Sequence, residues 1–225
     1  MTAPLDAHWL GPVSFADALA QQEEIVRRKH ARPETVDELL LLEHDPVYTI
    51  GRTPDRSSLR DADHLPHPLF QINRGGQATY HGPGQLVGYF LLDLRRYGQD
   101  LHRYLRWIEK LLIELLAQHD IEARARAGLT GVWVGERKIA SIGVGVRHWI
   151  TMHGFALNVS GMLTPFDAIT PCGIANVTMT SIEKETGELL QVQRVASETA
   201  ELAKERIAIL GSLVGRRSTG APVVF

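Results

Sequence analysis

The spacing of apolar residues predicts one long helix near the middle of the chain. Between residues 100 and 119, apolar side chains recur every three or four positions, which places them on one face of a helix. They are Leu101, Tyr104, Leu105, Ile108, Leu111, Leu112, Leu115 and Leu116. A stripe of this kind is typical of a helix that packs on a hydrophobic core, so His102 and His119 are expected on its solvent side.

Two further helices are expected nearer the ends of the chain. Ser14 precedes an amphipathic stretch that reaches about His30, and a serine in this position accepts from the free N–H groups of a first helical turn. Pro33 ends this stretch because proline lacks the N–H that a helix needs. Ser197 is expected to cap a last helix that runs to about Leu210.

Short apolar runs bounded by glycine, proline and charged residues predict the strands of a sheet. They lie at residues 38–43, 47–50, 70–72, 86–94, 121–126, 131–135, 139–146 and 151–159, and an edge strand is expected near residues 8–10. The strands occur in groups on either side of the long helix and do not alternate regularly with helices. This order favours an α+β fold with a mixed or mainly antiparallel sheet flanked by helices.

The length of the chain fits one large domain or two small ones. The 225 residues are 44% hydrophobic with a net charge of −2, so bulk charge does not indicate nucleic-acid binding. No apolar run reaches the length of a membrane span, and the N-terminus lacks the basic and apolar regions of a signal peptide. We therefore expect one domain over residues 1–225, with its core at about 13–214 and a loose tail at 215–225, and a cytoplasmic location.

The most unusual stretch lies between the strands at 70–72 and 86–94. Gly75, Gly76, Gly82, Gly84 and Pro83 fall within ten residues, with Arg74, Gln77, Thr79, Tyr80, His81 and Gln85 among them. Glycines let a backbone approach a ligand closely, so the pattern indicates a loop that forms the wall of a binding site. A surface turn is the alternative, although a turn does not need so many hydrogen-bonding side chains.

Cys172 is the best candidate nucleophile in the chain. It is the only cysteine, which excludes an internal disulfide and a thiolate-cluster metal site. Pro171 and Gly173 flank it in a polar loop, a setting for a thiol on a tight turn. A small buried hydrophobe is the alternative for any lone cysteine.

A thiol needs a nearby cation to be a thiolate at neutral pH. Lys138 follows the Gly135 turn and precedes a strand of small and apolar residues, so an inward-facing side chain would be partly desolvated. A solvated lysine is the alternative, and His81 and His153 are two further candidate partners for the thiol.

Other reaction classes lack their motifs. The chain contains no Gly-x-x-x-x-Gly-Lys-Ser/Thr loop, and the glycine-rich stretch lacks the Gly-x-Gly-x-x-Gly spacing of a dinucleotide site. It also has no His-Glu-x-x-His pair or paired-carboxylate motif, which makes a metallohydrolase or a glycosidase a weak interpretation. Neither a metal nor a cofactor is therefore expected.

Together these motifs resemble one known family, the lipoyl(octanoyl) transferases, or octanoyl-[acyl-carrier-protein]:protein N-octanoyltransferases. The family signature Arg-Gly-Gly-x-x-Thr-Tyr-His-Gly-Pro-Gly-Gln stands at residues 74–85, and Gly-Val-Trp/Tyr-Val-Gly-x-x-Lys-Ile stands at 131–139. Residues 141–143, 153–159 and 171–173 match three further family segments. The resemblance extends from about residue 44 to residue 182, and only the termini diverge.

The resemblance implies a fold, a mechanism and a site. The fold would be biotin/lipoate protein ligase-like, the class II aminoacyl-tRNA synthetase-like arrangement, in a single catalytic domain. Cys172 would carry the acyl group as a thioester, and Lys138 would lower its pKa. In the mechanism that we expect from this, Lys138 acts as the base, a role that His81 could share. The substrate would contact Arg74, Gly75, Gly76, Gln77, Ala78, Thr79, Tyr80, His81, Ser141, Ile142, Gly143, Gly154, Phe155 and Ala156.

The resemblance also implies the partners. An octanoyl-acyl carrier protein would be the donor, in the first step of endogenous protein lipoylation, with neither nucleic acid nor membrane involved. The acceptors would be lipoyl domains of 2-oxoacid dehydrogenase complexes and the glycine cleavage H protein. Because acyl carrier proteins are acidic, a basic rim is expected, with residues 52–68 as a loop that could move over the site. The candidates for the rim are Arg27, Arg28, Lys29, Arg52, Arg56, Arg124, Arg126, Arg137 and Arg147.

Three rival interpretations remain. An ATP-dependent lipoate or biotin protein ligase of the same fold would activate the free acid as an adenylate and would not need Cys172. An amidotransferase would take the acyl group from another protein lysine. A non-catalytic lipoyl-domain binder would leave Cys172 inert to mild alkylation.

Overall fold

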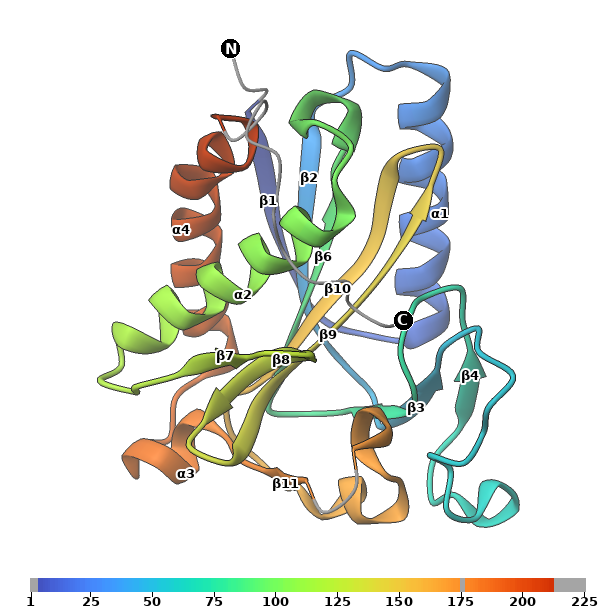
Figure 1. The fold of residues 1–225 in the computed structure, drawn as a ribbon, viewed down its shortest axis with the longest axis vertical. Coiled ribbons are helices and arrows are strands. Elements are labelled where there is room, and N and C mark those ends of the chain that lie inside the picture. The colour runs from blue at the N-terminus through green and yellow to red at the C-terminus, as the bar shows by residue number, and fades with distance from the viewer. Residues whose placement is uncertain (1–3, 175–176, 213–225) are drawn as a thin grey trace.

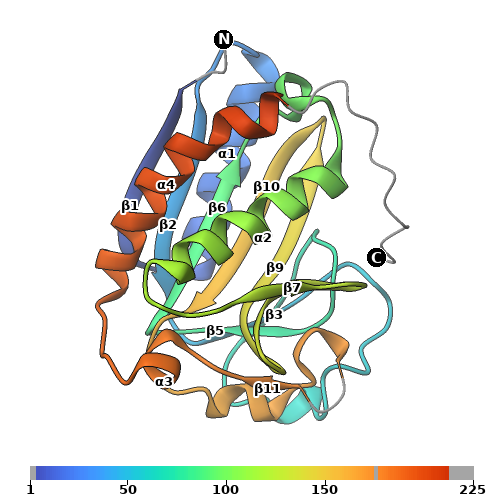
Figure 2. The same ribbon diagram turned by 60° about the vertical axis from the view of Figure 1, so that its left-hand side comes forward.

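The centre of the protein is an eight-stranded mixed sheet, seen in a computed structural model that describes residues 4–174 and 177–212 (Figures 1 and 2). The strand order is β1-β2-β6-β10-β9-β8-β7, and β11 adds beside β9. The strands are β1 (Leu5–Val13), β2 (Asp37–His44), β6 (Gln85–Leu91), β7 (Arg124–Arg126), β8 (Leu129–Val134), β9 (Arg137–Arg147), β10 (Ile150–Asn158) and β11 (Thr178–Met179). β1 runs parallel to β2 and β11 parallel to β9, whereas the other neighbours are antiparallel. The predicted mixed, mainly antiparallel sheet is confirmed.

Helices cover both faces of this sheet (Figure 2). They are α1 (Phe15–Ala31), α2 (Leu101–Ala117), α3 (Ile182–Thr186) and α4 (Val192–Ser212), with short 3₁₀ helices η1 (Ala62–His64), η2 (Leu94–Tyr97), η3 (Thr164–Ala168) and η4 (Pro171–Gly173). The largest hydrophobic cluster lies under α2 and α4 on one face, and α1 packs on the other face against β10 and β6. The predicted cap of α1 is confirmed, because Ser14 Oγ accepts from Asp17 N at 3.1 Å.

A second, three-stranded sheet carries the glycine-rich stretch. Its order is β4 (Leu69–Gln71), β3 (Val47–Ile50) and β5 (Thr79–His81). The prediction of one continuous loop here is wrong in its middle part, because Thr79–His81 pairs antiparallel with β3. Threonine and tyrosine are residue types that favour strands. The strand gives the glycine-rich stretch a rigid support between its two groups of glycines.

Two further expectations need correction. α4 begins at Val192 and not after Ser197, whose Oγ donates to Gln193 O one turn earlier at 3.1 Å. The helix starts sooner because Val192 is already buried in the hydrophobic cluster under α2 and α4. His102 is exposed as expected, but the side chain of His119 is only 8% exposed, because it contacts a glutamate of α4.

A buried ion pair fastens the end of α1 to β2. Lys29 Nζ lies 3.1 Å from Asp37 Oδ1, with the two side chains 1% and 0% exposed. The Tyr97 hydroxyl donates to Asp37 Oδ2 at 2.8 Å, and the backbone N–H of Asp93 donates to Oδ1 at 2.9 Å. Burial lowers the pKa of Lys29, and the charge of Asp37 opposes this. Lys29 was expected as a surface cation of a basic rim, which is wrong because its ammonium group is bound inside the protein.

The expected tail at residues 215–225 lies outside the described residues. Within the described part of the chain, no helix has both the length and the apolar composition needed to cross a membrane.

Candidate active site

Cys172 occupies an unusual backbone conformation in η4. Its φ of 55° and ψ of 20° lie in the left-handed region, which residues other than glycine rarely adopt. The N–H of Cys172 donates to Ala78 O at 2.9 Å, and the N–H of Gly173 donates to Thr170 O at 2.9 Å. These bonds fix the turn against the glycine-rich stretch. Backbone strain that the surrounding structure maintains is a reason to look for function at the strained residue.

The thiol of Cys172 meets a buried lysine. Its Sγ lies 3.1 Å from Lys138 Nζ and 3.7 Å from Ser141 Oγ. Lys138 is fully buried and is the second residue of strand β9, whereas the sequence placed it before the strand. Its Nζ also donates to Thr130 O at 3.1 Å and stands 5.3 Å from the centre of the Trp133 ring. The alternative of a solvated lysine is therefore wrong.

Two opposed effects set the pKa of the Cys172 thiol. Burial has the largest effect and raises the pKa, because a buried thiolate loses its solvation. The charge and hydrogen bond of Lys138, the hydroxyl of Ser141 and the charge of Arg74 lower it, and together they bring the pKa below its ordinary value. The surroundings of Cys172 thus favour a thiolate next to an ammonium group.

Replacing Lys138 by methionine, a side chain of similar length without charge, should raise the pKa of Cys172, because burial then acts without opposition from the lysine. The inflection of iodoacetamide alkylation against pH, followed by intact-protein mass, should move to higher pH. Lys184→Met, at an exposed lysine of α3, is the matched control and should leave the inflection in place. An unchanged inflection in Lys138→Met would show that the lysine does not control the thiol.

Arg74 organises the glycine-rich stretch from within. Its side chain is buried, and Nη2 donates to Thr49 O at 3.1 Å and to Gln77 O at 3.0 Å, while Nη1 donates to Gly75 O at 2.9 Å. Burial lowers the pKa of the guanidinium, and the neighbouring Cys172 thiolate opposes this. The segment between β4 and β5 is therefore wrapped around a positive charge that also acts on the reactive sulfur.

The two candidate histidines do not lie beside the thiol. His81 Nδ1 lies 2.8 Å from Gln85 Oε1, and burial lowers the pKa of His81 to about 3. Burial likewise lowers the pKa of His153 to about 3. Both rings are neutral at pH 7, and in the described residues neither hydrogen-bonds to Cys172 or Lys138. Nor does any group of three His, Cys, Asp or Glu side chains in this part of the chain lie close enough to hold a metal ion.

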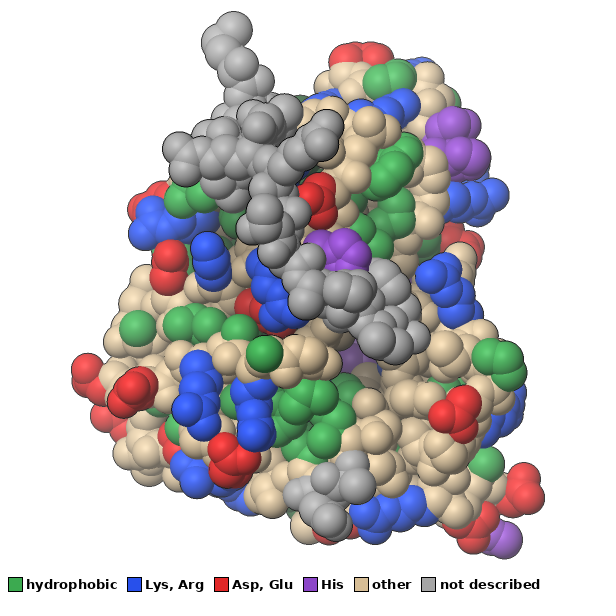
Figure 3. All heavy atoms as spheres, viewed as in Figure 1, with side chains coloured by type: hydrophobic (Ala, Val, Ile, Leu, Met, Phe, Trp, Pro, Cys, Tyr) green, Lys and Arg blue, Asp and Glu red, His purple; other side chains and the backbone are tan. Residues whose placement is uncertain are grey.

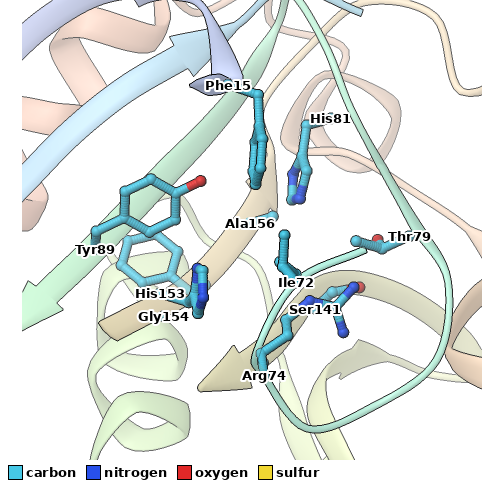
Figure 4. A pocket seen from close by; sticks show the side chains of 12 residues that line it. Phe15, Ile72, Arg74, Thr79, His81, Tyr89, Ser141, His153, Gly154 and Ala156 are labelled. Atoms are coloured by element: carbon cyan, nitrogen blue, oxygen red, sulfur yellow. The ribbon is translucent and has the colours of Figure 1, made fainter. Parts of the chain in front are cut away.

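A small cavity joins the glycine-rich stretch to β9 and β10 (Figure 4). Its volume is about 30 Å³, and it is lined by Phe15, Ile72, Arg74, Thr79, His81, Tyr89, Ser141, Gly143, His153, Gly154, Phe155 and Ala156. In Figure 4, His81 and Thr79 lie on one side of it, and Tyr89 and His153 lie on the other. The cavity brings together eight of the residues expected to contact the substrate.

A larger groove of about 280 Å³ carries Cys172 on its wall. It is lined by Arg52, Gly75, Gly76, Gln77, Leu101, Leu105, Gly128, Leu129, Thr130, Ile142, Gly143, Val144, Gly145, Val146, Cys172 and Ile174. Gly143 lines both the groove and the cavity. Figure 3 shows hydrophobic side chains reaching the surface over β8 and β9 on this face, with Lys and Arg side chains beside them. Ile142 was among the expected contacts, but the other apolar groove residues were missed, because their spacing in the sequence is that of ordinary core positions.

Two of the expected contact residues line neither hollow. The carbonyl of Ala78 holds the backbone of Cys172, as described above. Tyr80 packs its ring 5.4 Å from that of Tyr48, in a separate hydrophobic cluster. In this structure both residues support the site from behind.

Known proteins resemble this chain over most of its length. Residues 14–203 match the family model described as the lipoyl protein ligase A/B catalytic domain. The chain belongs to this family. Among curated family members, the octanoyltransferase of Citrifermentans bemidjiense is 49% identical over 191 residues, which are 85% of this chain and 91% of that protein. The octanoyltransferase of Geobacter metallireducens is 49% identical over 207 residues, 89% of this chain and 94% of that protein. These relatives confirm the prediction of an enzyme of the octanoyltransferase family.

Solved structures show how widely the fold of this family is shared. A lipoate-protein ligase A bound with ATP aligns with a TM-score of 0.69 at 16% identity, over 92% of this chain and 86% of that chain. The bipartite lipoate protein ligase of Thermoplasma acidophilum gives 0.68 at 16% identity, over 91% and 84%. The biotin protein ligase of Aquifex aeolicus gives 0.53 at 14% identity, over 92% and 70%. These likenesses concern the fold alone, and they confirm the predicted biotin/lipoate protein ligase-like architecture.

Proposed function

We propose that the protein moves an octanoyl or lipoyl group from acyl carrier protein to a lysine of a lipoyl domain, through a thioester on Cys172. The contact between Cys172 Sγ and Lys138 Nζ at 3.1 Å carries the proposal, in a chain whose relatives are octanoyltransferases. A buried ammonium group favours the thiolate and supplies a proton donor, and two successive acyl transfers need both. Lipoyl domains of 2-oxoacid dehydrogenase complexes and the glycine cleavage H protein are the proposed acceptors.

In the first transfer, the Cys172 thiolate attacks the carbonyl carbon of the donor thioester. A bond between this carbon and Sγ forms, and the bond to the sulfur of the carrier breaks. The Lys138 ammonium, 3.1 Å from Sγ, gives its proton to the departing thiolate. An acyl-Cys172 thioester then stands beside a neutral lysine amine.

In the second transfer, the amine of the acceptor lysine attacks the acyl-Cys172 thioester. Neutral Lys138 takes a proton from the attacking nitrogen, the amide forms, and Cys172 leaves as a thiolate. The original ion pair is restored, and no ATP is needed because an amide is more stable than a thioester. His81 is neutral and bonded to Gln85, so the geometry favours Lys138 over His81 as the base.

The tetrahedral intermediate of each step needs donors for its oxyanion. The N–H groups of Cys172, Gly173 and Ile174 already donate to backbone carbonyls in this structure. The hydroxyl of Ser141 and the ammonium group of Lys138 are donors that stand beside the reacting sulfur. We assign the stabilisation of the oxyanion to these two groups.

The acyl chain is assigned to the cavity of Figure 4, because Phe15, Ile72, Phe155 and Ala156 give it an apolar wall. At about 30 Å³ the cavity now has room for little more than a water molecule. The chain therefore enters only when the wall at Arg74 retreats, and the paired glycines that follow Arg74 suit such a movement.

Filling the cavity by Ala156→Leu should lower transfer of octanoyl groups by roughly 10-fold or more relative to butanoyl groups, as added methylenes in an apolar pocket usually do. Transfer rates from octanoyl- and butanoyl-loaded acyl carrier protein, measured under the same conditions, give this ratio. Val146→Leu, in the groove, is the matched variant and should leave the ratio unchanged. If Val146→Leu alone changed the ratio, the chain would lie in the groove.

The cations expected to dock an acidic carrier differ in whether a carboxylate of this chain already pairs with them. Five pair with carboxylates, namely Arg27 with Glu24, Arg28 with Glu38, Arg124 and Arg126 with Glu136, and Arg137 with Glu185. Arg52, Arg56 and Arg147 have no ion pair among the described residues, and Arg52 lines the groove of Cys172. These three arginines are the proposed contacts for the carrier.

Intact-protein mass tests the function directly. The pure protein, mixed with octanoyl-acyl carrier protein and no ATP, should gain the mass of one octanoyl group that hydroxylamine removes and that an added lipoyl domain accepts. Activity with free octanoate and ATP alone, with release of pyrophosphate, would identify a ligase. Activity with an octanoylated protein lysine as the sole accepted donor would identify an amidotransferase.

A further inference from the structure

A buried carboxylate of α2 stands behind the reactive pair. Glu109 is 1% exposed, although the buried face of α2 is otherwise uncharged. A carboxylate in such a place is costly unless its oxygens are bonded. Both are: Oε1 accepts from the N–H of Gly131 at 3.1 Å, and Oε2 lies 2.5 Å from Arg106 Nη1.

The N–H that Glu109 binds belongs to the peptide group that also binds Lys138. Gly131 N and Thr130 O are the two ends of one planar unit. Lys138 Nζ donates to Thr130 O at 3.1 Å and to Cys172 Sγ at 3.1 Å. A single peptide group therefore lies between the carboxylate of Glu109 and the ammonium of Lys138, and the lysine connects it to the nucleophile.

The backbone at Gly131 is shaped for this contact. Its φ is 131°, and a Cβ there would lie 2.6 Å from Lys138 Cε and 2.7 Å from Ala140 O. The lysine side chain thus occupies the space that a side chain at position 131 would take. With no side chain to restrict it, this peptide could rotate, and a rotation would remove the acceptor from Lys138. The hydrogen bond to Glu109 opposes such a rotation.

We infer that Glu109 is a positioning residue, which holds Lys138 against Cys172 through the Thr130–Gly131 peptide group. A carboxylate that accepts from the N–H also polarises the carbonyl at the other end and strengthens its bond to the ammonium group. Between the two transfers Lys138 is neutral. The Thr130 carbonyl then accepts from one N–H of the Lys138 amine, which leaves the nitrogen lone pair of Lys138 directed to the incoming amine. The inference rests on the proposed function only for this last step, because the position of Lys138 affects the thiol in the resting enzyme as well.

The test is the pH dependence of Cys172 alkylation in Glu109→Leu and Glu109→Gln. If Glu109 positions Lys138, the inflection moves to higher pH, further in the leucine variant than in the glutamine variant, which keeps an acceptor oxygen and the volume. If the carboxylate acted only through its own charge on the thiol, its removal would move the inflection to lower pH. Octanoyl transfer should fall by about 100-fold in Glu109→Leu, as expected for a misplaced catalytic group.

Two controls separate positioning from a general loss of structure. Glu114→Gln, at an exposed carboxylate of α2 that binds Arg206 at 2.7 Å, should leave the inflection unchanged. In a Lys138→Met background, Glu109→Gln should cause no further shift, because residues that act through one another are not additive. An unchanged or lowered inflection, or a full shift in the Lys138→Met background, would overturn the inference. The alkylation assay needs no acyl donor, so its outcome is independent of whether the proposed transfer is correct.

Discussion

Cys172→Ala should reduce octanoyl transfer from acyl carrier protein to a lipoyl domain by roughly 10⁴-fold or more, the scale of loss seen when a covalent nucleophile is removed. Without Sγ there is no atom to hold the acyl group, and Lys138 loses the anion that it contacts at 3.1 Å. The rate is measured as octanoylated lipoyl domain against time, with the protein in catalytic amount. The mass adduct with the donor should disappear in the same variant.

Cys172→Ser is the informative companion to the alanine variant. Its hydroxyl does not ionise near neutral pH, so Lys138 cannot convert it into a comparable nucleophile, and transfer should remain far below that of the unmodified protein. Cys172→Ser keeps a polar atom beside Lys138 and should unfold at nearly the same denaturant concentration as the parent, whereas Cys172→Ala leaves the buried ammonium group without this partner and should unfold at a lower concentration. Transfer by the variants and the parent is therefore compared well below the unfolding transition. Full transfer by Cys172→Ala would refute the thioester mechanism, and a dependence on ATP would then favour an adenylate.

Asp37→Ala should lower the free energy of unfolding by about 3–5 kcal/mol, the cost of leaving one partner of a buried ion pair alone. Lys29 is 1% exposed and would keep an unpaired charge in the protein. The hydroxyl of Tyr97 and the N–H of Asp93 would lose their acceptor as well. Urea unfolding followed by circular dichroism gives this change, and the octanoyl transfer rate below the transition should stay nearly unchanged because the cluster is remote from Cys172.

The exposed pair of Arg28 and Glu38 provides the control for Asp37. Its atoms approach to 2.6 Å, but the arginine side chain is 43% exposed. Arg28→Ala should therefore cost no more than about 1 kcal/mol, since water screens and replaces such a pair. Equal losses in the two variants would contradict a special role for the buried cluster. Lys29→Met combined with Asp37→Leu should recover part of the loss, because it removes the two fully buried charges together and leaves only Arg96, which is 23% exposed, without its carboxylate.

The fold could be predicted as far as the signals in the sequence were local. The repeat of apolar residues in α2 and the Ser14 cap of α1 depend on neighbours three or four positions away, and both were found. The start of α4 was missed because Ser197 resembles a cap, whereas contacts with distant strands determine where that helix begins. The strand at Thr79–His81 was missed for the same reason, since its partner β3 lies about thirty residues earlier.

In the candidate site too, residues with a local sequence signal could be predicted and residues placed by distant contacts could not. Cys172 and Lys138 stand beside glycine turns and in family motifs, so each could be named, and the structure adds that their side chains touch. Glu109 could not be named, because a glutamate on an amphipathic helix is ordinarily assigned to solvent. Its burial depends on where the backbone of Gly131 passes, which the spacing of residues does not reveal. The leucines of the groove were hidden likewise, because a leucine that lines a groove and a leucine in a core have the same spacing.

The turn of Cys172 and the guanidinium of Arg74 are fastened to consecutive residues of one segment. The N–H of Cys172 is bonded to Ala78 O, and Arg74 Nη2 is bonded to Gln77 O. An acyl chain that displaces this segment in order to enter the cavity must also shift the thiol. Binding of the acyl chain in the cavity and movement of the Cys172 thiol are then coupled. The length of the acyl chain should therefore affect kcat as well as KM. A donor whose acyl chain is too short to displace this segment would bind, but the thiol would stay in its resting position and react slowly.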